Sequence, residues 1–200
     1  MYVFATNNPG KARELKEIFG SAGLELQTLH DLNLSLSPEE TGNTFEENSK
    51  IKAVETAEFL RLHGYLDAIV LADDSGLAID AMDGRPGVDS ALFLGADTPH
   101  GQRNAFIINE LHGKPPGERT AYFVCVITCC WPSGEVLTVR GELEGLIAQA
   151  AKGENGFGYD PIFYVPTLDK NMAELSQEEK NKISHRGQAV REMIKKLKGK

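Results

Sequence analysis

The chain has 200 residues, of which 41% are hydrophobic, and its 21 basic and 29 acidic side chains give a formal net charge of −8. This length is typical of one domain, and this hydrophobic fraction is enough to form a buried core. A net negative charge argues against a protein that holds a nucleic-acid backbone by bulk charge. We therefore expect a single domain over residues 1–200 that binds no nucleic-acid polymer.

The first residues show no basic segment, no long apolar stretch and no cleavage signal. We expect a soluble, cytoplasmic protein that does not contact a membrane. The three cysteines, Cys125, Cys129 and Cys130, lie in one apolar run and lack the spacing of metal ligands. An odd number of cysteines in such a run predicts buried free thiols, not a disulfide framework or a zinc site.

The N-terminal part of the chain alternates between strand and helix patterns. Asn8 followed by Pro9 is typical of a helix start, and Thr44 with Glu47 has the spacing of a capping box. Apolar runs bounded by polar or turn residues mark the strands. In chain order the patterns predict a strand over residues 2–6, a helix after residue 8, a helix over about 44–64, and strands over 69–72 and 77–82.

The C-terminal part adds a hairpin and further helices. The turn Pro132-Ser133-Gly134 follows a long β-branched run and returns the chain as a hairpin would. An apolar stripe with lysines near its end marks the last helix. The patterns predict a helix over 98–113, strands over 120–130, 136–139 and 162–165, and a helix around 190–197. Helices mixed with strands and a hairpin predict a mixed α/β sheet, not a purely parallel one.

A glycine-rich loop, GFGYDP, carries the aromatic residues Phe157 and Tyr159 and the acidic residue Asp160. About twenty residues later, His185 and Arg186 add hydrogen-bonding groups. Aromatic rings on such a loop can offer a flat face to a base, while the polar groups contact its edge. We interpret these residues as a candidate nucleobase pocket. The alternative is that both rings are core residues beside a turn.

The sequence TNNPGK lies where the first strand passes into the first helix. Backbone N–H groups and the positive end of the helix dipole favour phosphate at such a place, and Lys11 adds a point charge. The segment is not a Walker A loop, and an ordinary capped helix explains much of the same pattern. The candidate phosphate-binding residues are Thr6, Asn7, Asn8, Pro9, Gly10 and Lys11.

Asp73 and Asp74 follow an apolar run, so we expect both carboxylates at the carboxyl end of a strand, where open α/β sheets place ligands. Adjacent residues of an extended segment point to opposite faces, so only one of the two should face a reacting centre. Magnesium usually takes one or two carboxylates together with phosphate oxygens and water. Glu40 is a candidate second ligand, and the alternative for Glu40 is a solvated acidic loop.

Two lysines are further candidates. Lys52 follows Asn48 by four positions in the second predicted helix, so the two share one helix face. Lys180 lies in SQEEKN, where Ser176 and Glu179 have capping-box spacing, and it could project beside the SHR segment. A solvated polar helix face and an exposed lysine are the respective alternatives.

Six motifs in register span nearly the whole chain: TNNPGK, EETGNTFEENS, ADDSGL, RPGV, GFGYDPIF and EEKNKISHRGQA. In this order and spacing the chain resembles the inosine/xanthosine triphosphate pyrophosphatases, also called non-canonical purine triphosphatases. The resemblance implies an elongated mixed α/β fold with a cleft between two lobes, a homodimer, and dependence on Mg²⁺. It also implies hydrolysis of the purine nucleoside triphosphate to the monophosphate and pyrophosphate.

The resemblance also implies roles for individual residues. It places residues 6–11 on the phosphates, Glu40 and Asp74 on the metal, Asp74 as the catalytic base, and Ser75 on the substrate. We further expect Lys52 to act with Lys11 on the leaving pyrophosphate. The base and sugar end would be held by Phe157, Gly158, Tyr159, Asp160, Lys180, His185 and Arg186. One departure is Leu92, which stands where members of the family often have an arginine.

Two other functions fit the same residues. A nucleotide-binding module without catalysis would keep the base pocket and the phosphate site but would not need Glu40 and Asp74 together. A magnesium-dependent phosphatase would use an aspartate pair after a strand, and it would release orthophosphate, whereas the pyrophosphatase releases pyrophosphate.

Overall fold

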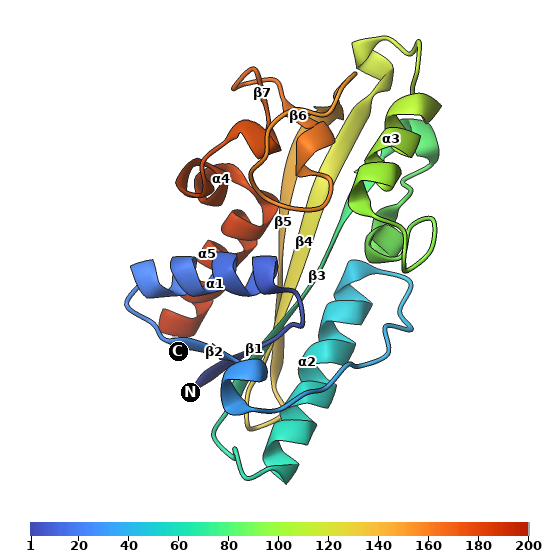
Figure 1. Cartoon of the computed structure of the whole chain (residues 1–200). Helices are drawn as coiled ribbons and strands as arrows, with labels where there is room; N and C mark the ends of the chain where they lie inside the picture. The colour runs from blue at the N-terminus through green and yellow to red at the C-terminus, as the bar shows by residue number, and fades with distance from the viewer. Residues whose placement is uncertain (200) are drawn as a thin grey trace. The chain divides into compact units, whose positions relative to one another are not determined.

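The computed structural model describes residues 1–199, which contain seven strands, five α-helices and several short 3-10 helices. The strands form one sheet in the order β2-β1-β3-β4-β5-β6-β7 (Figure 1). They are β1 (Tyr2–Ala5), β2 (Leu26–Thr28), β3 (Ile69–Ile79), β4 (Thr120–Cys130), β5 (Val136–Ile147), β6 (Phe163–Val165) and β7 (Lys170–Asn171). The helices are α1 (Pro9–Ser21), α2 (Phe45–Leu62), α3 (His100–Glu110), α4 (Gln177–Ile183) and α5 (His185–Lys198).

The sheet is mixed, as the sequence predicts. Strand β1 is parallel to both β2 and β3, and Phe4 pairs with Leu71 across the second of these contacts. Strands β5 and β6 are antiparallel, and so are β6 and β7. The predicted α/β class with a mixed sheet is therefore confirmed.

The chain divides into two compact units, and three strands contribute residues to both. Unit 1 consists of Met1–Asp74, Cys125–Gly141 and the residues from Arg186 onward. Unit 2 consists of Ser75–Val124 and Glu142–His185. Hydrophobic cores lie within each unit, two in unit 1 and one in unit 2 among the described residues.

In unit 1 the strands bury both of their faces. Phe4 and Leu71 pack in a core formed with α1 and α5, whereas Val3, Val70 and Ala72 pack in a second core on the side of α2. Figure 1 shows α1 and α5 on one side of β1 and α2 on the other. This alternation is the period of two expected of a strand covered by helices on both faces. It determines which helix each later residue of β3 faces.

Unit 2 has a single core that joins α3 to its strands and to the segment after β5. Leu77 of β3, Ile107 of α3 and Phe163 of β6 are fully buried in it. Phe123 of β4 stacks on Phe163 with ring centroids 4.2 Å apart. The GFGYDP loop enters this core through Tyr159.

Several local predictions from the sequence are confirmed. Asn8 caps α1, and Thr44 and Glu47 form the predicted capping box at the start of α2. Ser176 and Glu179 form a further box at α4. The three cysteines are buried and free. Within the described part of the chain, no helix is long and apolar enough to cross a membrane.

The prediction of two strands over 69–72 and 77–82 is wrong, because β3 runs without a break from Ile69 to Ile79. Asp73 and Asp74 therefore lie within a strand, not at its carboxyl end. Buried charged residues interrupt an apolar run in the sequence, but here each carboxylate has cationic partners, so the strand continues through them. Strand β5 also extends to Ile147, beyond the predicted end at 139.

Candidate functional site

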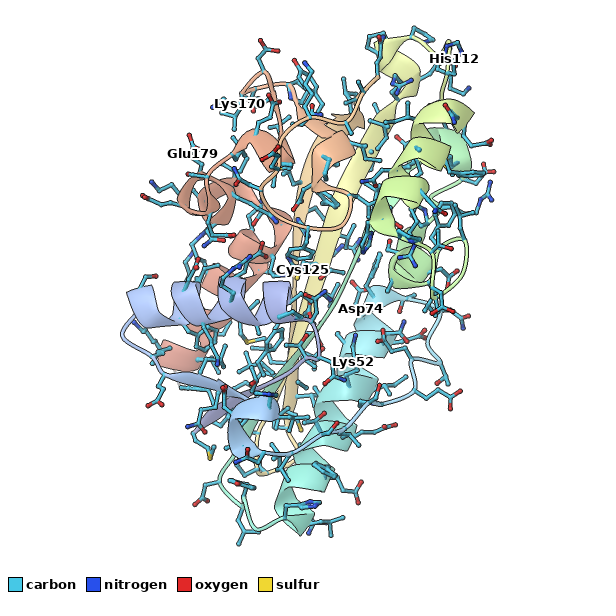
Figure 2. All side chains as sticks on the ribbon, in the orientation of Figure 1. Lys52, Asp74, His112, Cys125, Lys170 and Glu179 are labelled. Atoms are coloured by element: carbon cyan, nitrogen blue, oxygen red, sulfur yellow. The ribbon has the colours of Figure 1, made fainter. Side chains whose placement is uncertain are left out.

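Asp74 lies on the α2 face of β3 and is only 5% exposed. Its Oδ1 atom is 3.6 Å from the Nζ atom of Lys52, and its Oδ2 atom accepts a hydrogen bond of 3.2 Å from the Nδ2 atom of Asn48. Asn48 and Lys52 come from successive turns of α2. Figure 2 shows the labelled side chains of Lys52 and Asp74 next to each other.

Lys52 also binds Glu40, the predicted second metal ligand. The Nζ atom is 3.0 Å from Oε2 of Glu40, whose side chain is 43% exposed. Two carboxylates from distant parts of the sequence thus converge on one ammonium group. Glu40 is exposed and accessible to a ligand, and its role at a metal stays a prediction.

The charged groups in this cluster shift each other's pKa values. Burial raises the pKa of Asp74 to about 6, although the ammonium groups of Lys52 and Lys11 oppose the shift. Burial alone would lower the pKa of Lys52, but Asp73, Asp74 and Glu40 more than compensate and raise it. Lys52 is therefore charged at neutral pH, and burial makes the carboxylate of Asp74 easier to protonate than an exposed one.

The two carboxylates are suitable ligands for a magnesium ion. Within residues 1–199 there is no group of three or more His, Cys, Asp or Glu side chains that could hold a metal. Magnesium does not need such a cage, because it commonly binds through one or two carboxylates with substrate phosphates and water. Glu40 and Asp74 both approach the same cation, the ammonium of Lys52, so their geometry already accommodates a positive charge between them.

Asp73 lies on the opposite face of β3 and is 2% exposed. Its Oδ2 atom is 2.9 Å from Nζ of Lys11 and 3.6 Å from Nε of Arg186. Arg186 in turn contacts Glu14 of α1, with 2.6 Å between Nη1 and Oε2. Burial opposes the charge of Arg186, but Glu14 and Asp73 raise its pKa and keep it protonated. Three buried residues, Glu14, Asp73 and Arg186, and the half-buried Lys11 thus form a charged network in unit 1.

Arg186 lies in this charged network, beside Glu14 and Asp73. The family resemblance places Arg186 at the base, but its guanidinium is buried in unit 1 and contacts the same Asp73 carboxylate as Lys11, a predicted phosphate ligand. A contact between Arg186 and a base stays a prediction. The structure adds that Arg186 and Lys11 share the carboxylate of Asp73.

The N-terminus of α1 is capped by its own sequence. The Oδ1 atom of Asn8 accepts hydrogen bonds from the backbone N–H groups of Gly10 and Lys11, at 2.9 and 3.1 Å. Thr6 Oγ1 accepts from the N–H of Asn8, and the side chain of Asn7 donates to Leu36. The ordinary capped helix is therefore present, and phosphate binding by residues 6–11 stays a prediction.

In unit 2 the GFGYDP loop is held by Asp160. Its Oδ2 atom accepts from the N–H of Phe157 at 2.8 Å and from Nζ of Lys180 at 2.6 Å. Both charged side chains of this pair are less than 5% exposed. The Lys180 ammonium also lies 4.6 Å from the centroid of the Phe157 ring. Three predicted base-binding residues are thus brought together, and Phe157 is half-buried among them.

Tyr159 and His185 are more enclosed than a base platform would require. The Tyr159 hydroxyl donates to the carbonyl of Ser90 at 2.7 Å, and burial raises its pKa to about 12. His185 stacks on Phe123, with 4.7 Å between ring centroids. Tyr159 therefore packs in the core of unit 2, as the alternative interpretation of this loop allows. Its role and that of His185 at a base stay predictions, as does the contact of half-buried Ser75 with substrate.

A cavity of about 420 Å³ in unit 2 is lined by the same loop and by α3. Asn104 of α3 lines it and donates from Nδ2 to the carbonyl of Gly158 at 3.1 Å. The remaining wall is mostly apolar, and Ile108 and Pro161 contribute to it. Asn104 therefore fixes the backbone of the loop next to Phe157.

Sequence reasoning missed three of these residues. Glu14 lies on the buried stripe of α1 next to Leu15, and an acid at such a position is a signal of a buried ion pair. Asn104 gave no comparable signal, because a polar residue in the middle of a helix is usually exposed. Asn48 shares its helix face with Lys52, but nothing in the sequence indicated that it would bond Asp74.

A family model described as the Ham1 family matches residues 2–196. This chain belongs to the Ham1 family. A relative from an Exiguobacterium species, named dITP/XTP pyrophosphatase, is 48% identical over 96% of this chain and 93% of its own. A protein of the same name from Bacillus subtilis is 44% identical over 98% and 96% of the two chains.

Solved structures of Ham1 family proteins agree with this membership. The Ham1 protein of Staphylococcus aureus is 41% identical, with a TM-score of 0.84 over 99% of this chain and 98% of that one. A Ham1 protein from Coxiella burnetii has a TM-score of 0.86 at 36% identity, covering 100% and 98% of the two chains. The mixed α/β fold is thus the fold of the family.

Proposed function

We propose that this protein hydrolyses non-canonical purine nucleoside triphosphates, such as dITP, ITP and XTP, to the monophosphate and pyrophosphate. The convergence of Glu40 and Asp74 on the ammonium of the half-buried Lys52 is the observation that carries the proposal. A binding module without catalysis has no use for such a pair. The names of the relatives from Exiguobacterium and Bacillus subtilis support this substrate class.

The charged residues of unit 1 have separate tasks in this reaction. Asp74 accepts a proton from the water that attacks the α-phosphorus. Lys52, which already binds both carboxylates, and Lys11 compensate the charge of the leaving pyrophosphate. A magnesium ion bound by Glu40 and Asp74 would supply further neutralisation of phosphate charge. Positioning and electrostatics, not covalent catalysis, then account for the rate.

Selectivity comes from the six-position of the purine. Inosine and xanthosine bases have a carbonyl acceptor there, whereas adenine has an amino donor. Donors from the segment of His185 and Arg186 would be satisfied by the first and left unpaired by the second. A site that requires such a hydrogen bond can reject the wrong partner by roughly 10⁴-fold. Phe157, half-buried beside Lys180, is the ring that would stack on the base.

The proposed activity also fits a cytoplasmic homodimer. Free nucleotides are present in the cytoplasm, and three buried free cysteines are usual in a reducing compartment. Light scattering coupled to size-exclusion chromatography measures the number of chains in solution. We expect two.

The proposal is tested by identifying the phosphate species released from a panel of nucleoside triphosphates with Mg²⁺. We expect pyrophosphate from dITP, ITP and XTP, little reaction with dATP, and loss of activity when EDTA removes the metal. Release of orthophosphate would indicate a phosphatase. Binding of dITP without any released phosphate would indicate a nucleotide-binding module.

A further inference from the structure

Asn48 is a buried amide in the second turn of α2 for which the proposed reaction has no role. Asn48 is 3% exposed. Both the nitrogen and the oxygen of its side-chain amide are hydrogen-bonded. Nδ2 donates to Oδ2 of Asp74 at 3.2 Å. Oδ1 accepts from the backbone N–H of Gly42 at 2.8 Å. One amide thus connects the loop after Glu40 to the proposed catalytic base.

These two hydrogen bonds limit the position of both proposed metal ligands. Gly42 follows Glu40 by two positions, so anchoring its N–H restricts where the Glu40 side chain can begin. On Asp74, the amide takes Oδ2, while Oδ1 is the oxygen that faces Lys52. Lys52, one turn further along α2, contacts both carboxylates. Asn48 therefore defines the orientation of the carboxylate and the approach of the loop at the same time.

The start of α2 does not need Asn48 as a cap. The Thr44 hydroxyl accepts from the N–H of Glu47 at 3.1 Å, and the Glu47 carboxylate accepts from the N–H of Thr44 at 3.2 Å. Glu47 also accepts from the N–H of Asn43 at 2.7 Å. This capping box already satisfies the end of the helix. The amide of Asn48 is directed to Asp74 and Gly42 instead.

The close contact with Asn48 requires a glycine at position 42. A Cβ atom at this position would lie 2.7 Å from Oδ1 of Asn48 and 2.6 Å from the Cβ atom of Glu47. Both distances are too short for a side chain, so the loop reaches Asn48 only because residue 42 is a glycine. The close approach gives a second, independent way to disturb the connection without changing Asn48.

We propose that Asn48 is a positioning residue that sets the spacing of the Glu40 and Asp74 carboxylates for a divalent cation, an inference that rests on the proposed function. Magnesium demands a near-octahedral set of oxygens at about 2.0–2.1 Å and tolerates little displacement. Residues that orient metal ligands through hydrogen bonds typically contribute about 10- to 100-fold to metal affinity or activity. Asn48 never touches the substrate in this proposal.

The experiment compares Asn48→Leu, which keeps most of the volume but removes both hydrogen bonds, with Gly42→Ala, which displaces the loop. Mn²⁺ replaces Mg²⁺, and electron paramagnetic resonance measures its binding to the full-length protein, alone and with pyrophosphate. We expect each variant to weaken Mn²⁺ binding by about tenfold or more. We also expect a raised Mg²⁺ concentration at half-maximal activity, with a lowered kcat that excess Mg²⁺ partly restores.

Ser49→Ala is the matched control. Ser49 is the next residue of α2 and is fully buried, but its hydroxyl bonds Thr128 at 2.7 Å and not a carboxylate. This variant should lower the stability of the fold without changing Mn²⁺ affinity. Circular dichroism and thermal unfolding show which variants fold, and two routes to the same connection keep the inference testable if one of them does not.

The inference is overturned if a folded Asn48→Leu or Gly42→Ala protein binds Mn²⁺ as tightly as the wild type. It is equally overturned if the wild type binds no Mn²⁺ in either titration. The proposed function fails separately, if the wild-type protein releases no pyrophosphate from dITP or XTP. The two claims therefore have different decisive measurements.

Discussion

Asp73 and Asp74 are consecutive in β3, but their carboxylates serve opposite faces of the strand. Asp74 meets Lys52 and Asn48 of α2, whereas Asp73 meets Lys11 of α1 at 2.9 Å. The two aspartates therefore have different partners, Lys11 for Asp73 and residues of α2 for Asp74. Their substitutions should have different effects.

Asp74→Asn should lower kcat by about 10²- to 10⁴-fold, the usual contribution of a general base. The substitution keeps the shape of the side chain, so circular dichroism should show an intact fold. Asp73→Asn should instead destabilise the fold, because it leaves the buried charge of Arg186 and the half-buried charge of Lys11 with less compensation. Pyrophosphate release and urea unfolding of both variants measure these effects. If both variants lost kcat equally and neither lost stability, the proposed difference between the roles of Asp73 and Asp74 would be contradicted.

The pKa of Asp74 predicts how stability depends on pH. Burial holds this pKa at about 6 in the folded chain, above its ordinary value of 3.8. Between these values the folded state keeps a proton that the unfolded chain has lost, so the contribution to stability is complete below about pH 4 and is lost as pH rises through 6. The difference between the two pKa values corresponds to roughly 3 kcal/mol.

Urea unfolding without metal, at pH 4 and pH 7.5, measures this contribution as the difference between the wild type and Asp74→Asn. Relative to the variant, the wild type should lose roughly 2–3 kcal/mol over this range. An unchanged difference would show that Asp74 titrates alike in the folded and unfolded chains.

Lys180→Ala should destabilise the protein by about 3–5 kcal/mol, because it leaves the buried carboxylate of Asp160 without its cation. The same change should raise KM, since Asp160 also holds the N–H of Phe157. Lys182→Ala is the matched control on the same helix, because its partner Glu178 is exposed and the pair is screened by water. Similar urea midpoints for the two variants would contradict the importance of the buried pair.

Substitutions at two glycines of the GFGYDP loop separate a steric collision from the effect of backbone conformation. Both Gly156 and Gly158 have a positive φ, of 74° and 67°, which disfavours any side chain. At Gly156 a Cβ atom would also collide with the Asp160 carboxylate, whereas at Gly158 it would meet only Cε1 of His100 at 3.8 Å. Gly156→Ala should therefore raise KM for dITP and lower stability more than Gly158→Ala. The reverse order would show that Asp160 does not organise the loop.

Local signals in the sequence predicted the local structure well. Side chains of Asn8, Thr44 and Ser176 bond backbone groups within a few residues, so the starts of α1, α2 and α4 follow from the sequence alone. From the residues alone Glu40 was only a candidate partner of Asp74, and the family resemblance assigned both to one metal. Contacts between residues far apart in the chain leave no pattern in the neighbouring sequence from which they could be predicted.

The failures have the same origin. Asp73 and Asp74 were expected to end a strand, because charges in an apolar run ordinarily mark its end, and only their cations allow β3 to continue. The ion pair between Arg186 and Glu14 was missed because the two residues are 172 positions apart in the chain. Pairing across such a separation is decided by tertiary structure, which periodicity and spacing do not describe.

Hydrolysis of dITP in ¹⁸O-labelled water tests most directly whether water attacks the α-phosphorus with Asp74 as its base. If it does, mass spectrometry should find the label in the monophosphate and none in the pyrophosphate, and Asp74→Asn should slow formation of the labelled monophosphate by about 10²- to 10⁴-fold. Label in pyrophosphate or in orthophosphate would place the attack on another phosphorus and contradict the proposed reaction.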